Sequence, residues 1–169
     1  VQDTLYKRSM KQFLTKIFKK ALYQRYFDKF WGVGSLQTKF ALDIGFDKKD
    51  IKEGFYVADK KFFDNSSIVD FKNKFLNILF IGRLVKEKNI IKLAEAIDSI
   101  NNSINSRHKL IVIGEGYLKN EIQNYECVKY EGSKSQDDII EIARNCDLFC
   151  LPSIYEPWGV VTHEMCSLG

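Results

Sequence analysis

FLNILFIGRL, at residues 75–84, is apolar at most positions and lacks the alternation of a strand with one face in water. HKLIVIGEG, at 108–116, has the same character at its centre. Between them, EKNIIKLAEAIDSI at 87–100 carries apolar residues three and four positions apart, as one face of a helix does. A buried strand, a helix and a second buried strand predict a parallel sheet that is covered on both faces.

The alternation of strands and helices continues to residue 169. We expect a short helix at 117–124, a strand at 127–132, a helix at 135–146, a strand at 147–153 and the start of a helix at 159–169. Ser135 and Asp138 have the spacing of a capping box for the second of these helices. The predicted fold class is α/β, with a Rossmann-like parallel sheet flanked by helices.

Shorter elements precede this sheet. KFWGVGS (29–35) indicates a strand, and SLQTKFALDIG (35–45) indicates a helix with Ser35 as its N-cap and Gly45 as its C-cap. DIKEGFYVAD (50–59) indicates another strand. The periodicity is then lost around Asn65, Ser66 and Ser67. The predicted domains are therefore residues 1–64, a linker at 65–74 and a second domain at 75–169.

The positive charge is concentrated near the start of the sequence. Residues 1–25 hold seven lysines and arginines and a single aspartate, whereas the whole chain has a net charge of only +4. Apolar residues recur at helical spacing within residues 4–26, so we expect a basic amphipathic helix there. This pattern favours attraction to an anionic membrane surface over nucleic-acid binding.

The composition, 45% hydrophobic and 28% charged, is typical of a globular protein. There is no apolar run long enough for a membrane span and no signal-peptide pattern at the start of the sequence. The four cysteines form no C-x-x-C pair, and three of them have apolar neighbours. We therefore expect reduced core cysteines and a cytoplasmic protein, peripheral to the inner face of the membrane if the basic segment binds lipid.

Two glutamates follow the last expected strand. Glu156 belongs to the loop PSIYEPW, and Glu164 belongs to the first or second turn of the next helix. Burying a carboxylate is costly unless it is paired or hydrogen-bonded, so these side chains either are solvated or line a site. Ligands of parallel sheets bind at the carboxyl ends of the strands, where this loop begins. We therefore expect Glu156 at the binding edge.

Arg83 and Lys88 follow the first strand of the sheet and are expected at the same edge. Fixed cations there would stabilise the negative charge that develops on a phosphate leaving group. Gly159, Val160 and Val161 open the last helix, so their free N–H groups can also face a phosphate. The alternative is that Arg83 and Lys88 are surface cations at a helix start and bind no ligand.

Other site classes are less well supported. GEG at 114–116 lacks the third glycine of the dinucleotide fingerprint, so NAD binding is not expected. Glu156 and Glu164 would be about 12 Å apart along one helix, farther than a glycosidase pair requires. Cys146 and Cys150 straddle a strand and His163 has no partner nearby in sequence, so no metal site is expected.

Four stretches, in this order and spacing, resemble the nucleotide-binding domain of the retaining GT-B glycosyltransferases of group 1. They are FIGRLVKEKNI (80–90), IVIGEGYLKNEI (111–122), VKYEGSKSQDDI (128–139) and DLFCLPSIYEPWGVVTHEMCSLG (147–169). The family's mark is a glutamate, seven residues and a second glutamate, usually written E-P-x-G-x-x-x-x-E. It is matched here by Glu156, Pro157, Gly159 and Glu164.

The resemblance implies roles for individual residues. Residues matching Arg83 and Lys88 hold the diphosphate of the donor, and the residue matching Glu156 contacts the donor sugar. Glu164 resembles the residue that accepts hydrogen bonds from both ribose hydroxyls. The resemblance further implies that the base and nucleoside lie against the following residues: Gly114, Gly116, and 129–132, which include Tyr130 and Gly132.

The implied activity is transfer of a sugar, with retention, from a UDP- or GDP-linked donor to an acceptor hydroxyl. The resemblance implies no cofactor or metal, a glycan or lipid-linked acceptor and a place in cell-envelope polysaccharide synthesis. Residues 26–63 resemble the end of the family's acceptor-side domain, so we expect a fragment that is inactive alone. Alternatives are a noncatalytic nucleotide-binding or membrane-surface module, or an epimerase or synthase with the same domain.

Overall fold

The chain divides into two compact units, the second of which begins at Val57. The computed structural model describes residues 26–55, 57–63, 74–156 and 159–169. The expected basic helix and nearly all of the expected linker at 65–74 lie outside these residues. Residues 57–63 belong to the second unit, before the predicted domain end at 64, because Ala58 and Phe62 pack into its core.

The first unit is a small β-α-β arrangement. Its elements are β1 (Phe30–Gly32), α2 (Ser35–Asp43), the 3-10 helix η1 (Lys48–Asp50) and β2 (Ile51–Glu53). The two strands pair in parallel, with Phe30 opposite Ile51. Phe40 and Ile44 are buried between the helix and the strands. The expected elements are therefore present, although β2 is much shorter than the expected strand at 50–59.

The predicted caps of α2 differ from those observed. Ser35 is the first helical residue, and Gly34 is the N-cap without a side-chain hydrogen bond. Ile44 is the C-cap, and Gly45 follows it with a φ of 94°. A glycine just beyond a helix end commonly adopts this left-handed conformation, so the C-cap lies one position earlier than predicted and Gly45 is the residue after it.

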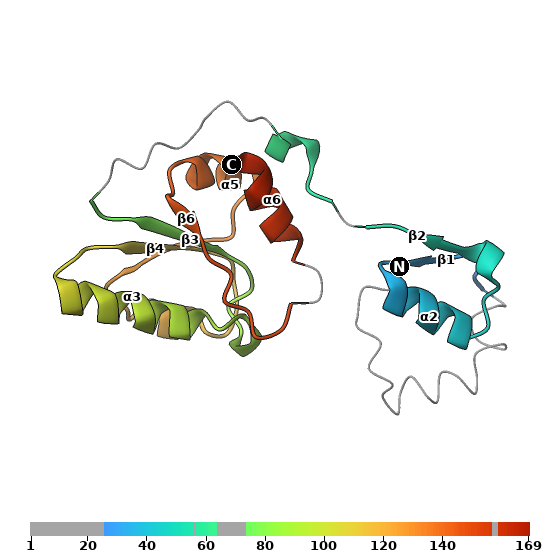
Figure 1. The fold of residues 1–169 in the computed structure, drawn as a ribbon. Helices are drawn as coiled ribbons and strands as arrows, with labels where there is room; N and C mark the ends of the chain where they lie inside the picture. The colour runs from blue at the N-terminus through green and yellow to red at the C-terminus, as the bar shows by residue number, and fades with distance from the viewer. Residues whose placement is uncertain (1–25, 56, 64–73, 157–158) are drawn as a thin grey trace. The chain divides into compact units, whose positions relative to one another are not determined.

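The second unit is built on a four-stranded parallel sheet with the order β5-β4-β3-β6 (Figure 1). Its elements are η2 (Lys60–Phe63), β3 (Asn77–Ile81), η3 (Lys86–Lys88), α3 (Ile90–Ile104), β4 (Lys109–Ile113), α4 (Lys119–Ile122), β5 (Val128–Gly132), α5 (Gln136–Arg144), β6 (Leu148–Phe149) and α6 (Val160–Leu168). The α/β fold class with a helix-flanked parallel sheet is confirmed.

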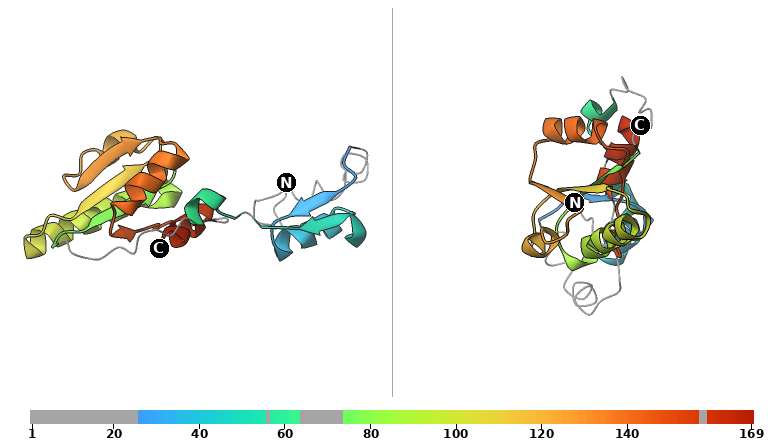
Figure 2. Two further views of the ribbon diagram at one scale, coloured as in Figure 1. Left: turned by 90° about the horizontal axis from the view of Figure 1, so that it is seen from above. Right: turned by 90° about the vertical axis from the view of Figure 1, so that its left-hand side faces the viewer.

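Helices cover both faces of this sheet. Figure 1 shows α3 on one face and α5 with α6 on the other, and the right-hand view of Figure 2 shows the same layers. Phe80 and Leu79 are adjacent in β3 and face opposite sides, yet both are buried. Two-sided burial explains why the sequence of this strand does not alternate. Fully burying such a side chain contributes about 1.5–3 kcal/mol.

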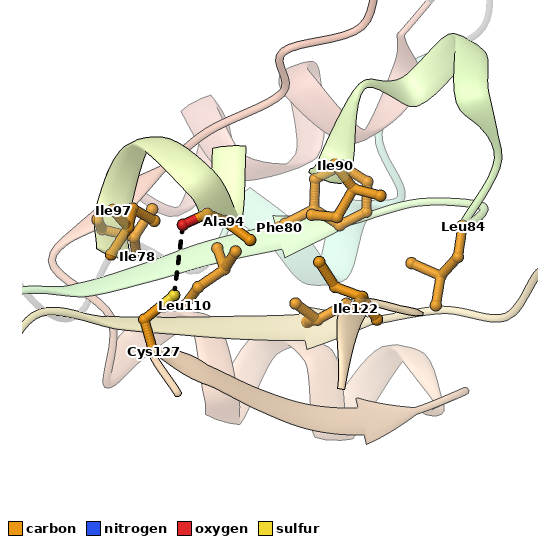
Figure 3. Close-up of a cluster of buried hydrophobic side chains, with 10 residues drawn as sticks. Ile78, Phe80, Leu84, Ile90, Ala94, Ile97, Leu110, Ile122 and Cys127 are labelled. Carbon is orange, nitrogen blue, oxygen red and sulfur yellow. Dashed lines mark hydrogen bonds between the residues drawn. The ribbon is translucent and has the colours of Figure 1, made fainter. Parts of the chain in front are cut away.

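The core on the α3 side contains ten buried residues. Figure 3 shows Ile90 of α3 beside the ring of Phe80 and Ile97 of the same helix beside Ile78, with Ala94 between them. The thiol of Cys127 closes this cluster by contacting the carbonyl of Ala94 at 3.7 Å. The helical spacing predicts that these three helix residues and Ile91 face inward; Ile91 is only partly buried and packs against this cluster. The core thus fixes α3, and with it the loop that precedes it.

The helix α5 begins as predicted. The hydroxyl of Ser135 accepts the N–H of Asp138 at 3.2 Å, and the Asp138 carboxylate accepts the N–H of Ser135 at 3.3 Å. Two N–H groups that the helix leaves unpaired are thereby satisfied. The capping box is confirmed.

The four cysteines are free thiols. Cys127 and Cys146 are buried, and burial raises the pKa of these thiols to about 12 and about 11. They therefore stay neutral at physiological pH. Cys166 is exposed on α6, so the expectation of core cysteines is wrong for this residue.

No helix within the described ranges is long and apolar enough to cross a membrane.

Candidate functional site

The loops that leave the carboxyl ends of the strands meet along one edge of the sheet. This edge is the usual ligand site of parallel α/β sheets. Every predicted site residue lies at a strand end, in one of these loops or on α6. The loops are joined by backbone bonds, because Gly82 N–H reaches the Ile113 carbonyl at 3.0 Å and Gly114 N–H reaches the Gly132 carbonyl at 2.9 Å.

Lys88 and Glu156 are brought into contact at this edge. Lys88 ends η3, Glu156 lies in the loop after β6, and the ammonium contacts Oε2 of the carboxylate. Their side chains are only 12% and 26% exposed, respectively. A charge held this far from water needs a partner, and each of these groups compensates the other. Lys88 is therefore not the exposed surface cation that its position at a helix start indicates.

Backbone contacts hold the two loops together. The N–H of Cys150 bonds to the Leu79 carbonyl at 2.9 Å, just beyond the last residue of β6. The N–H of Ile154 bonds to the carbonyl of Glu87 at 2.9 Å. Because Glu87 precedes Lys88, this bond fixes the loop before α3 against the loop before α6. The Lys88–Glu156 contact is thus supported by the main chain.

The start of α6 lies against the same carboxylate. Gly159 is the N-cap of α6 with a φ of 65°, in the left-handed region. A Cβ atom at Gly159 would lie 3.1 Å from Cγ of Glu156. The first N–H groups of a helix, here those of Val160 and Val161, have no acceptor within it and carry partial positive charge. A lysine and a helix N-terminus therefore both lie close to Glu156.

Glu164 lies one turn farther along α6 and is half-buried. Burial raises the pKa of this carboxyl group; the negative charge of Asp59 acts in the same direction, and His163 opposes them. Asp59 is held nearby because Ala58 N–H bonds to Nδ1 of His163 at 3.2 Å. In the part of the chain that the structure describes, the Glu164 carboxylate accepts no hydrogen bond. Its oxygens are available to a ligand.

Arg83 lies in the loop after β3 and its side chain is exposed. Across the described ranges its guanidinium forms no ion pair or hydrogen bond. Its five donors are therefore free to bind an anion. The structure brings Lys88 and Glu156 together but places Arg83 in no contact with either of them.

Backbone packing at Gly114 leaves no space for a side chain, which the sequence alone does not indicate. A Cβ atom at Gly114 would lie 2.0 Å from the carbonyl oxygen of Gly82, and its φ is 134°. Gly116 meets the backbone of Leu84 in the same way, at 2.3 Å. These glycines allow the loops after β3 and β4 to touch each other. This packing accounts for both residues without reference to a nucleoside.

Tyr130 and Gly132 end β5 beside Gly114. The Tyr130 hydroxyl lies 2.6 Å from Glu115 Oε1 and 3.1 Å from the Gly114 carbonyl. Burial, followed by the Glu115 carboxylate, raises the pKa of Tyr130, so the hydroxyl keeps its proton and donates. Lys119 stacks over the ring at 4.9 Å from its centroid. The Tyr130 ring is thereby held in one position at the end of this edge of the sheet.

Sequence reasoning missed Ser153, Glu115 and Tyr117. Ser153 donates to Glu156, Glu115 accepts from Tyr130, and the Tyr117 hydroxyl accepts the N–H of Lys86 at 2.9 Å. All three residues lie in loops that follow strands, and this position is the sequence feature from which a role at the site could have been predicted. Within the described residues, no cluster of three or more His, Cys, Asp or Glu side chains is placed to hold a metal ion.

The chain matches a known family over most of the second unit. Residues 62–169 match the family model described as glycosyl transferases group 1. The uncharacterized glycosyltransferase MJ1607 of Methanocaldococcus jannaschii is 30% identical over 99 residues, which are 54% of this chain and 25% of that protein. The putative teichuronic acid biosynthesis glycosyltransferase TuaC of Bacillus subtilis is 31% identical over 90 residues, which are 53% of this chain and 22% of that protein. The chain thus spans about a quarter of these relatives.

Solved glycosyltransferases share the fold. WaaG, a glycosyltransferase involved in lipopolysaccharide biosynthesis, has a TM-score of 0.68 at 15% identity, covering 96% of this chain and 48% of its own. Anabaena HepE, solved with UDP and glucose, has a TM-score of 0.63 at 15% identity. The match covers 92% of this chain and 46% of the HepE chain. These identities establish similarity of fold, and the family is established by the sequence match over well over half of the chain. The chain belongs to the glycosyl transferases of group 1.

Proposed function

We propose that this chain carries the donor site of a retaining glycosyltransferase, which moves a sugar from a nucleotide sugar to an acceptor hydroxyl. The observation that carries the proposal is the contact between Lys88 and Glu156 beside the start of α6. It places a cation, a carboxylate and free helix N–H groups at the carboxyl edge of the sheet. These are the groups that a sugar diphosphate requires.

The diphosphate of the donor would bind to Arg83, Lys88 and the N–H groups of Gly159, Val160 and Val161. As the bond from the sugar to the diphosphate breaks, negative charge grows on the departing phosphate. Lys88 is largely buried beside Glu156, and from there its ammonium would turn to the phosphate and stabilise this charge. Arg83 adds a planar set of donors that matches phosphate geometry. These groups would supply the electrostatic stabilisation without a metal.

The nucleoside would lie along the same edge. Glu164 has the two free oxygens that a pair of ribose hydroxyls needs, because a carboxylate only accepts. The base would lie near Gly114, Tyr130 and Gly132, where the Tyr130 ring forms a fixed wall. HepE was solved with UDP and glucose, and TarM of S. aureus with UDP, which supports a uridine nucleotide. GDP-linked sugars are the other donor class to test.

The acceptor would come from outside this site. TuaC is named for teichuronic acid biosynthesis and WaaG for lipopolysaccharide biosynthesis, which supports a glycan or lipid-linked acceptor of the cell envelope. The basic segment at residues 4–26 would then attract an anionic membrane on which such an acceptor lies. In the complete enzyme, the acceptor oxygen would bond to the sugar on the face that the diphosphate leaves.

Glu156→Gln is expected to lower kcat in the complete enzyme and to leave the donor KM almost unchanged. A contact to the sugar changes as the bond breaks, so its loss acts mainly in the transition state. Steady-state kinetics with UDP- and GDP-linked hexoses measure this, and NMR of the first product should show the donor's anomeric configuration. An inverted product, or a variant with unaltered kcat, would contradict the proposal.

Glu164→Gln is expected to raise the donor KM and leave kcat nearly unchanged, because a ribose contact is made equally in the ground and transition states. It should also raise the melting temperature at neutral pH. Burial raises the pKa of Glu164, so the folded state is less stable when this group is ionised. The gain should shrink as the pH falls toward the ordinary glutamate pKa, about 4.3, and should be absent below it.

Glu121→Gln on α4 is the matched control for this substitution, because Glu121 is exposed. It should alter neither the donor KM nor the melting temperature. Lower stability of Glu164→Gln at neutral pH together with an unchanged KM would mean that Glu164 is structural.

A further inference from the structure

Ser153 contacts the same carboxylate oxygen as Lys88. Its hydroxyl donates to Oε2 of Glu156 at 3.1 Å, and Lys88 contacts the same oxygen. Ser153 is itself only partly exposed, so this hydrogen bond is sheltered from water. A hydrogen bond to an ionised group contributes more stabilisation than one between neutral groups. The carboxylate is therefore anchored through one oxygen by two side chains.

The other oxygen of Glu156 is left open. Within the residues that the structure describes, no donor reaches Oε1. Ionised carboxylates have about four acceptor positions, so this oxygen retains its full capacity for a ligand hydroxyl. Gly159 closes one side of the carboxylate, because a Cβ atom there would lie 3.1 Å from Glu156 Cγ. The contacts thus distinguish an anchored oxygen, Oε2, from an open one, Oε1.

The anchoring depends on Lys88 only while no diphosphate is present. Under the proposed function, Lys88 turns toward the diphosphate when the donor binds, since a doubly charged anion attracts it more strongly than one carboxylate. Glu156 would then lose its cationic partner. A partly buried carboxylate without a hydrogen-bond donor costs free energy, and its side chain is free to rotate. Ser153 is the remaining side chain in contact with it.

We infer that Ser153 is a positioning residue, which keeps Glu156 aimed at the donor sugar after Lys88 has moved to the diphosphate. This inference rests on the proposed function and adds a residue that acts through Glu156 without touching the substrate. The loop geometry supports it, because the Ile154 N–H bond to the Glu87 carbonyl holds Ser153 in place whether or not Lys88 moves. The role of Ser153 is thus largest in the donor complex.

The test compares Ser153→Ala, Ser153→Thr and the wild type in the complete enzyme, with UDP-glucose and GDP-mannose as probes. Release of nucleoside diphosphate is measured with water as the acceptor. Ser153→Ala is expected to lower kcat about tenfold or more, from the scale of a hydrogen bond to a charged group. The donor KM should change less than twofold, and Ser153→Thr, which keeps the hydroxyl, should recover most of kcat.

Ser103→Ala on α3 is the matched control, because this exposed serine also loses one hydrogen bond, to the Ile100 carbonyl, away from the site. Its kcat should equal that of the wild type. A Ser153→Ala enzyme with unaltered kcat, or a loss that Thr does not restore, overturns the role of Ser153 while the proposed function stands. A wild type that releases nucleotide from neither donor overturns both.

Discussion

Lys88→Ala is expected to lower kcat/KM for the nucleotide sugar about 30- to 150-fold, or about 2 to 3 kcal/mol of barrier. Lys88 is the cation that the structure holds against Glu156, whose side chain lies close to Gly159 at the start of α6. Its removal takes away charge stabilisation that is needed most as the sugar bond breaks. Steady-state kinetics of the complete enzyme measure the loss.

Lys86→Ala provides the matched control. Lys86 lies two residues earlier in the same 3-10 helix, its side chain is exposed, and its contact with Tyr117 is made by the backbone. It should retain nearly full activity. Equal losses in Lys86→Ala and Lys88→Ala would show a general effect of positive charge, and unchanged turnover of Lys88→Ala would refute its assignment.

Lys88→Ala also allows the effect of this residue on stability to be measured apart from its effect on catalysis. Without Lys88, the Glu156 carboxylate remains partly buried and lacks its counterion, so the melting temperature should fall. Combining Lys88→Ala with Glu156→Gln removes the unpaired charge. The double variant should recover stability, while its kcat/KM should stay at or below that of Lys88→Ala.

Gly114→Ala is expected to destabilise the second unit by about 3 kcal/mol or more, since a strained backbone and a steric overlap each cost about 1–3 kcal/mol. The added Cβ would lie 2.0 Å from the Gly82 carbonyl oxygen, at a φ of 134°. The obstacle is backbone, which cannot rotate away as a side chain can. Urea denaturation of the chain measures the change.

Gly132→Ala tests whether the overlap is responsible. Gly132 also has a positive φ, 72°, but the nearest atom to its added Cβ is a side-chain oxygen of Glu115 at 3.6 Å. Only the conformational cost remains, about 1 kcal/mol. Equal destabilisation by the two substitutions would show that the contact between Gly82 and Gly114 is not what the glycine protects.

The arrangement of the second unit could be predicted because its signals are local. Ile90, Ala94 and Ile97 recur at helical spacing, and these three residues are buried on α3. Ser135 and Asp138 are three residues apart and form the predicted capping box. The order of strands and helices then fixes the edge at which loops meet, so the locations of Lys88 and Glu156 could be predicted as well.

The details that were missed depend on contacts between distant residues. Lys88 and Glu156 are 68 positions apart, and their pairing follows from how two loops pack, which no periodicity encodes. The same is true of Gly114, whose neighbour is the backbone of another strand's loop. Ser35 was misassigned as a cap because Gly34, the residue before it, takes that position without a side chain.

A crystal structure of the complete enzyme with a bound nucleoside diphosphate tests the central claim most directly. The account predicts that the phosphates contact Arg83, Lys88 and the N–H groups at the start of α6, that the ribose hydroxyls contact Glu164, and that Glu156 keeps its bond to Ser153. A nucleotide bound elsewhere, or a diphosphate at this edge with Lys88 still paired to Glu156 and no contact to it, would contradict the account.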